Sequence, residues 1–197
     1  IVPSRRAEFI PYVAGTASMT GTQAAGDPFD DGSEWDGRVG ADFKVGLGSN
    51  LTLDGTINPD FGQVEADPAE VNLTAFETFF PEQRPFFIGG NQLLQGTGPG
   101  YYYSRRIGAT PQGYATGEVA DSADFLESPR YATILGAAKL TGRTSSGMSI
   151  GALAAVTQRE YANAYIADSN AYRKIAVEPT TFYAVARAQQ ELGKSAS

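Results

Sequence analysis

The stretch DGRVGADFKVGLGSNLTLDGTIN, residues 36–58, decides the fold of this chain. Its first half alternates along the backbone, with apolar side chains at every second position and charged side chains or glycine between them. The apolar set is Val39, Ala41, Phe43, Val45 and Leu47, and the charged set is Asp36, Arg38, Asp42 and Lys44. Gly48-Ser49-Asn50 has the residues of a tight turn, and Leu51, Leu53 and Ile57 then alternate with polar residues. This pattern predicts an antiparallel hairpin with one apolar face and one charged face.

The same design returns elsewhere in the chain. We expect strands at 8–20, 131–142, 148–159 and 181–192, which brings the total to about six and predicts an all-β, antiparallel fold. Short connections (48–50, 143–147, 193–197) fall at one end of these strands, and long connections (21–35, 60–130, 160–180) fall at the other. Short turns on one rim and long loops on the other are typical of outer-membrane β-barrels, in which apolar side chains face lipid and polar side chains face the lumen. A soluble antiparallel sheet with one wet face is the alternative.

Six strands cannot close a bacterial barrel, which has at least about eight. The chain also begins with Ile1 and ends in a turn-like sequence. We therefore expect an internal piece of a longer protein, with further strands beyond residue 197. The barrel strands would occupy 1–59 and 131–197, with an insertion at 60–130 between them.

Composition removes several classes of function. The 197 residues carry a net charge of −7, which argues against a nucleic-acid partner because no basic field would gather phosphates. The chain contains no Cys and no His, which excludes disulfides, thiol nucleophiles, the usual zinc ligands and the Ser-His-Asp triad. It also has no apolar run of roughly 18 residues, so it encodes no membrane-spanning helix.

The stretch NPDFGQVEADPAEVNLTAFETFFPEQRPFF, residues 58–87, interrupts the strand pattern. Asp67-Pro68 followed by Glu70 is typical of a helix start, and Pro81 forbids continuation, so we expect a short helix near 68–80. After it, 84–87 and 101–107 look extended. A connection as long as 60–130 must carry structure of its own. We expect this insertion to fold inward and to fill the lumen as a plug.

The segments DFGQVEADPAEVNLTAFETFFPEQRPFF and YYYSRRIG, with RRAEFIPY near the N-terminus, closely resemble the signature of a domain-of-unknown-function family of Gram-negative outer-membrane proteins. In that family the domain commonly follows a family 9 carbohydrate-binding-like module. The resemblance covers most of the chain and implies a large barrel in the bacterial outer membrane. It supplies no catalytic residues, because the family has none assigned.

A cluster of charged residues surrounds the predicted helix. The acids are Asp60, Glu65, Asp67 and Glu70, and the bases that follow are Arg84, Arg105 and Arg106. Hard cations take several carboxylate oxygens, so a Ca²⁺ site is one interpretation, although the spacing does not match an EF-hand loop. A pair of glycosidase carboxylates is another. We prefer an ion-pair network that fastens the insertion to the barrel wall, because buried charges are retained only when they are paired.

These observations favour a barrel that passes or captures a solute, with a carbohydrate suggested only by the family's usual neighbouring module. The expected partners are outer-membrane lipid and either a carbohydrate or another envelope protein. A structural scaffold barrel with a closed lumen and a soluble carbohydrate-binding or carbohydrate-active β-protein are the two alternatives. No catalytic residue is predicted, and no cofactor is expected apart from the Ca²⁺ alternative. The aromatic residues at 79–80 and 101–103 could stack on sugar rings or serve as core and girdle side chains.

Overall fold

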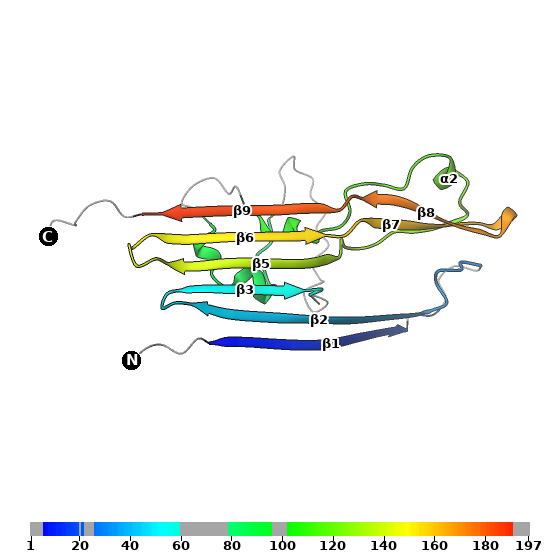
Figure 1. Ribbon diagram of the computed structural model, residues 1–197. Helices are drawn as coiled ribbons and strands as arrows, with labels where there is room; N and C mark the ends of the chain where they lie inside the picture. Colours follow the sequence, from blue (N-terminus) through cyan, green and yellow to red (C-terminus); the bar gives the residue numbers. More distant parts are fainter. Residues whose placement is uncertain (1–5, 20, 22–25, 60–78, 96–101, 191–197) are drawn as a thin grey trace.

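The computed structural model describes residues 6–19, 21, 26–59, 79–95 and 102–190. Six strands in this part of the chain form one antiparallel sheet in the order β1-β2-β3-β5-β6-β9 (Figure 1). Their bounds are β1 (Ala7–Met19), β2 (Ser33–Leu47), β3 (Leu51–Ile57), β5 (Ile134–Arg143), β6 (Ser149–Thr157) and β9 (Thr181–Gln189). The prediction of an all-β, antiparallel fold is confirmed. Within the described ranges the sheet is not closed, since β1 and β9 lie at its two edges.

The register of the sheet follows the alternation read from the sequence. Val45 lies opposite Leu53, and Lys44 lies opposite Asp54, so the apolar and charged sets of the β2–β3 hairpin fall on separate faces. The turns at 48–50 and 144–148 lie at one end of the sheet, and the longer connections lie at the other (Figure 1). The local residue pattern therefore fixes both the pairing and the facing of this hairpin.

One face of the six-stranded sheet, which we call the open face, carries apolar side chains from edge to edge. Its paired positions on β1–β3 are Ala7, Phe9, Pro11, Val13, Gly15, Ala17, Met19, Trp35, Gly37, Val39, Ala41, Phe43, Val45, Leu47, Leu51, Leu53, Gly55 and Ile57. On β5, β6 and β9 they are Gly136, Ala138, Leu140, Gly142, Ile150, Ala152, Ala154, Val156, Phe182, Ala184, Ala186 and Ala188. Among the described paired positions, Ser33 at the end of β2 is the one polar residue on this face. Large side chains here are exposed to a high degree: Val13 by 80%, Trp35 by 73% and Phe182 by 70%.

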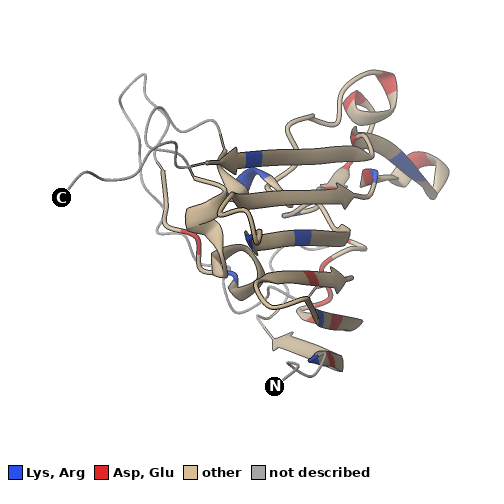
Figure 2. Ribbon diagram, turned by 60° about the vertical axis from the view of Figure 1, so that its left-hand side comes forward, with Lys and Arg blue, Asp and Glu red and all other residues tan. Residues whose placement is uncertain are grey.

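The opposite face, which we call the covered face, carries the charged residues. Its part on β3, β5, β6 and β9 is packed against residues 79–95 and 102–107, which we call the inward segment (Figures 1 and 2). The inward segment contains a single helical turn, α1 (Pro85–Ile88), and the 3₁₀ turns η2 (Asn91–Leu93) and η3 (Ser104–Arg106). The core lies between this segment and the sheet, and consists of Phe87, Leu94, Ile107, Ile134, Ala137, Leu153 and Ala155. The expectation that 84–87 and 101–107 are extended is wrong for 85–87 and 104–106, which lie in α1 and η3. Pro85 occupies a first helical position and starts the first of these turns. The helix predicted near 68–80 lies outside the described residues, apart from its last two positions.

A second sheet extends the first one beyond its long-loop end. It consists of β4 (Phe125–Glu127), β7 (Glu160–Ile166) and β8 (Ala171–Glu178), in the order β4-β7-β8, with α2 (Glu118–Asp121) nearby (Figure 1). The connection expected at 160–180 is long and lies at the expected end of the sheet, but it is not a loop. The segment is a hairpin that continues β6 and β9 outward, and its tip is formed by η4 (Ala167–Ser169) and by Asn170 in a left-handed conformation (φ 49°).

Candidate functional site

A buried ion pair holds the inward segment in shape. Arg84 donates from Nε to Oε1 of Glu82 (2.8 Å) and from a terminal nitrogen to Oε2 (2.8 Å), so the pair is bidentate. The side chains of Arg84 and Glu82 are only 9% and 8% exposed. The guanidinium also lies over the ring of Phe87, 4.2 Å from its centroid. A planar guanidinium suits this site because its N–H groups can hydrogen-bond a carboxylate while its face stacks on an aromatic ring.

The same arginine joins two parts of the inward segment that are about twenty residues apart. It donates to the backbone carbonyls of Ile107 (2.7 Å) and Ser104 (2.8 Å), and the Ser104 hydroxyl donates to Oε2 of Glu82 (2.5 Å). Burial would raise the pKa of Glu82, but hydrogen bonds from Arg84 and Ser104 outweigh burial and hold that pKa below its usual value. The carboxylate is therefore ionised at neutral pH and completes a fully paired network.

Tyr102 lies beside this network. Burial, together with the negative charge of Glu82, raises the pKa of Tyr102 to about 12. Its neighbour Tyr103 exchanges hydrogen bonds with the backbone of Phe80, accepting at 3.0 Å and donating at 3.3 Å, and its ring meets Phe79 edge-on with centroids 5.0 Å apart. Tyr103 therefore packs against the first predicted aromatic cluster within the inward segment, while Tyr102 packs against the core.

The structure places the three basic residues of the predicted cluster separately. Arg84 forms the buried pair, and its partner Glu82 was not among the predicted acids. Arg105 donates to the carbonyl of Pro81 (2.8 Å) and lies 5.7 Å from the ring of Phe80. Arg106 is exposed, and its backbone nitrogen donates to the carbonyl of Tyr103 (3.2 Å). The four predicted acids, Asp60, Glu65, Asp67 and Glu70, lie outside the described residues.

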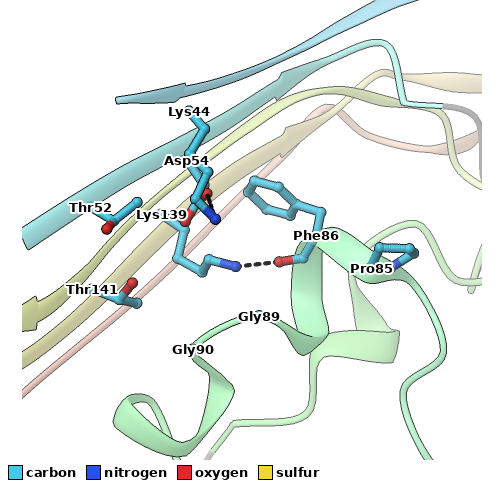
Figure 3. Close-up of a pocket in the computed structure, with 9 residues that line it drawn as sticks. All are labelled: Lys44, Thr52, Asp54, Pro85, Phe86, Gly89, Gly90, Lys139 and Thr141. Atoms are coloured by element: carbon cyan, nitrogen blue, oxygen red, sulfur yellow. Dashed lines mark hydrogen bonds and ion pairs between the residues drawn. The ribbon is translucent and has the colours of Figure 1, made fainter. Parts of the chain in front are cut away.

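A second site lies between the inward segment and the covered face. It is a cavity of about 200 Å³, which we call the Lys139 pocket, and Figure 3 shows its lining. The sheet contributes Lys44, Thr52, Asp54, Lys139 and Thr141, and the inward segment contributes Pro85, Phe86, Gly89 and Gly90. In Figure 3 the sheet side chains project from neighbouring strands toward the turn that carries Phe86 and the two glycines. Three parts of the chain that are distant in sequence, 44–54, 85–90 and 139–141, thus line one cavity.

The pairing of β2, β3 and β5 sets the charges of this pocket in a row. Lys44 lies opposite Asp54, and Asp54 lies opposite Lys139, which gives the order positive, negative, positive across three strands. Lys44 Nζ is 3.4 Å from the carboxylate of Asp54. Lys139 is only 2% exposed, its ammonium donates to the backbone carbonyl of Phe86, and it lies 4.8 Å from the centroid of the Phe86 ring. A lysine of the sheet therefore holds the inward segment by the backbone and the ring of Phe86.

Two further contacts seat the inward segment on β6 and β9. Arg187 approaches the carbonyl of Leu93 at 3.5 Å. Gly151 lies directly beneath the same backbone, because a Cβ added at Gly151 would stand 2.6 Å from the Leu93 carbonyl oxygen. The missing side chain permits this close approach.

Sequence reasoning missed Glu82, Ser104 and Lys139. Glu82 had a usable signal, since it stands two residues before Arg84 between Pro81 and Pro85. Lys139 had a weaker one, as a lone lysine in an Ala- and Leu-rich strand. Neither position reveals its partner, because Ser104 and Phe86 approach only in the folded chain.

The two sites can do two things: the contacts of Arg84 and Lys139 hold the inward segment in place, and the Lys139 pocket has space for a ligand. In the part of the chain that the structure describes, no group of three acidic side chains is placed to hold a metal ion. The described helices are all too short or too polar to cross a bilayer. The Glu82–Arg84 network is internally satisfied, whereas the Lys139 pocket combines charge, hydroxyl groups and an aromatic ring around a space.

No curated protein and no solved structure matches the chain. A protein-family model described as "Domain of unknown function (DUF5916)" matches residues 3–197, which is nearly the whole chain. Since the match extends through the strands, the inward segment and the second sheet alike, the chain belongs to the DUF5916 family of domains of unknown function.

Proposed function

We propose that this chain forms part of an outer-membrane β-barrel that passes or captures a solute. The open face of the sheet contacts lipid, and the covered face lines a lumen that the inward segment fills. The observation that carries this proposal is the inversion of the usual arrangement. The face with Phe, Trp, Leu and Val is exposed, while Thr56, Lys139 and Thr141 on the opposite face of β3 and β5 are buried.

A soluble sheet buries its apolar face and solvates its polar one, because the apolar area removed from water drives folding. An apolar surface as continuous as the open face marks a membrane or protein contact. The strand lengths support lipid as the contact. Five of the six strands have nine to fifteen residues, and tilted membrane strands need about 9–11.

The inward segment supports a gated or plugged lumen. Lys139 holds it from the wall, and the Glu82–Arg84 pair stiffens it internally. The resemblance to outer-membrane proteins that carry a family 9 carbohydrate-binding-like module favours a carbohydrate-related solute. A scaffold barrel with a permanently closed lumen is the second candidate, and the firm attachment of the inward segment favours it.

A pair of spin labels tests the membrane assignment. The chain contains no Cys, so Ala41→Cys and Asp42→Cys each give a single label in this domain at neighbouring positions of β2 on opposite faces. In the full-length protein reconstituted in lipid, we expect the label at 41 to be accessible to oxygen and shielded from a water-soluble nickel chelate. The label at 42 should show the reverse. A label at 41 that the nickel chelate reaches as readily as the one at 42 would contradict the lipid-facing assignment.

Conductance separates passage from scaffolding. We expect the full-length protein to be closed in a planar bilayer and to conduct after deletion of residues 60–107. A deletion variant that inserts into the bilayer and stays silent would favour the scaffold barrel.

A further inference from the structure

We propose that the Lys139 pocket binds a small hydroxylated carboxylate, with the Lys139 ammonium as the anchor for the carboxylate. This inference rests on the proposed function, because it identifies the class of solute that the lumen captures. Three features of the pocket carry it: its net charge, the donors left to Lys139, and the shape and polarity of the space.

The pocket has an excess of positive charge. Its charged side chains are Lys44, Asp54 and Lys139, and the ion pair between Lys44 and Asp54 at 3.4 Å occupies one lysine. Lys44 is also the more exposed lysine, with a side chain that is 60% exposed. Lys139 is 2% exposed, so bulk water screens its charge less than it screens the charge of Lys44. An anion in the pocket would complete the row of alternating charges across β2, β3 and β5.

The ammonium of Lys139 has donors to spare. A lysine ammonium carries three N–H donors, and the acceptor that the structure gives it is the backbone carbonyl of Phe86. The Phe86 ring covers one side of the ammonium. Gly89 leaves space on another side, since a Cβ added there would stand 3.5 Å from Nζ. A buried cation with open donors beside a cavity is suited to a negatively charged oxygen ligand such as a carboxylate.

The size and the lining of the space indicate the rest of the ligand. A cavity of about 200 Å³ exceeds the engineered cavity of about 150 Å³ that holds benzene, so one six-membered ring can enter. Thr52 and Thr141 lie opposite each other on β3 and β5 and line the pocket beside the lysine. Hydroxyl groups of a ligand can bond to these threonines, and its ring face can lie on Phe86. A sugar-acid-sized molecule meets all three requirements.

The test compares two probes that share a ring and differ by one carboxylate, glucuronate and glucose. Calorimetric titration of the full-length protein in detergent should show saturable binding of glucuronate and at least about tenfold weaker binding of glucose, as expected for a charge-assisted hydrogen bond. Lys139→Met should weaken glucuronate binding by at least about tenfold and leave glucose binding unchanged. Thr52→Val, which keeps the shape of the side chain, should weaken both probes. Lys174→Met, an exposed lysine on β8 outside the pocket, serves as the matched control and should change neither affinity.

Two results would overturn the proposal. One is equal affinity of the wild-type protein for the two probes, or no saturable binding of either. The other is glucuronate binding that survives both Lys139→Met and Thr52→Val. The titration does not depend on which face meets lipid, and the spin-label experiment does not depend on the pocket, so failure of this inference and failure of the barrel proposal are distinguishable.

Discussion

Replacing Arg84 by Met should loosen the inward segment without unfolding the strands. The substitution keeps much of the side-chain length and removes the charge, both bonds to Glu82 and both bonds to the carbonyls of Ser104 and Ile107. Removing one member of a buried ion pair leaves the other charge buried without a partner, which costs about 3–5 kcal/mol. The carbonyls of Ser104 and Ile107 also lose their hydrogen-bond donor, which destabilises the inward segment further, but such losses are not additive.

The quantity to measure is the free energy of local opening, read from hydrogen exchange of the full-length protein in detergent. A loss of about 3–5 kcal/mol corresponds to exchange that is faster by roughly two to four powers of ten. We expect this acceleration at backbone nitrogens that the inward segment itself pairs, such as those of Phe87 and Ile107. Peptides from β7, which the inward segment does not hold, are the internal control and should not change.

A double variant tests the physical reason. Glu82→Leu combined with Arg84→Met removes both charges, so no stranded carboxylate remains, and the double variant should be less destabilised than Arg84→Met alone. Unchanged exchange in Arg84→Met would refute the assignment of this pair as the fastening of the inward segment. A double variant as damaged as the single one would show that packing, and not the buried charge, sets the cost.

Three further predictions follow from the same contacts. The pKa of Glu82 is lowered in the folded state, so its ionised carboxylate stabilises the fold at pH values above its ordinary pKa of 4.5. This stabilisation is lost as the pH falls from 4.5 through the lowered pKa. Glu82→Gln should abolish this pH dependence of stability in acid unfolding curves. Val39→Asp on the open face should destabilise a lipid-inserted protein by less than the roughly 2–4 kcal/mol that Arg or Lys costs at the bilayer midplane, while Asp42→Asn should be nearly silent, as measured by urea unfolding in bilayers; equal costs would contradict the facing. Gly151→Ala should destabilise the docked inward segment by about 1–3 kcal/mol, measured as faster proteolysis of that segment, because its Cβ would stand 2.6 Å from a backbone oxygen. Gly37→Ala, whose Cβ would meet nothing within 4 Å, should be tolerated and serves as the control. Equal protease resistance in the two variants would count against the docking geometry.

Much of the main sheet could be predicted because strand alternation is a local property. Positions such as Val39 and Phe43 reveal their shared face by spacing alone, and the glycine-containing turns fix which strands pair. The hairpin of β7 and β8 was missed because both of its faces mix polar and apolar residues, as in Tyr161 and Asn163. Its turn was nevertheless visible in the Asp-Ser-Asn run at 168–170, which is typical of a hairpin tip.

The sites were less accessible to sequence reasoning. Arg84 was identified as a member of a buried ion pair, but the acids considered were those around the predicted helix, and the partner in the structure is the adjacent Glu82. The sequence around Pro85 predicts an extended segment where the structure has a turn, because a four-residue helix is too short to show periodicity. Lys139 was overlooked because a single lysine on a strand is unremarkable until its surroundings are known.

The sequence by itself determined the strands of the six-stranded sheet, the separation of an apolar from a charged face, and the absence of thiol and imidazole chemistry. These properties depend on neighbouring residues and on composition, so they are present before the chain folds. Only the tertiary structure decided which face is covered, where Arg84 donates, and how Lys44, Asp54 and Lys139 align beside Phe86. Those outcomes depend on backbone segments that are distant in sequence and meet only when hydrogen-bonded strands and the packed inward segment fix their positions.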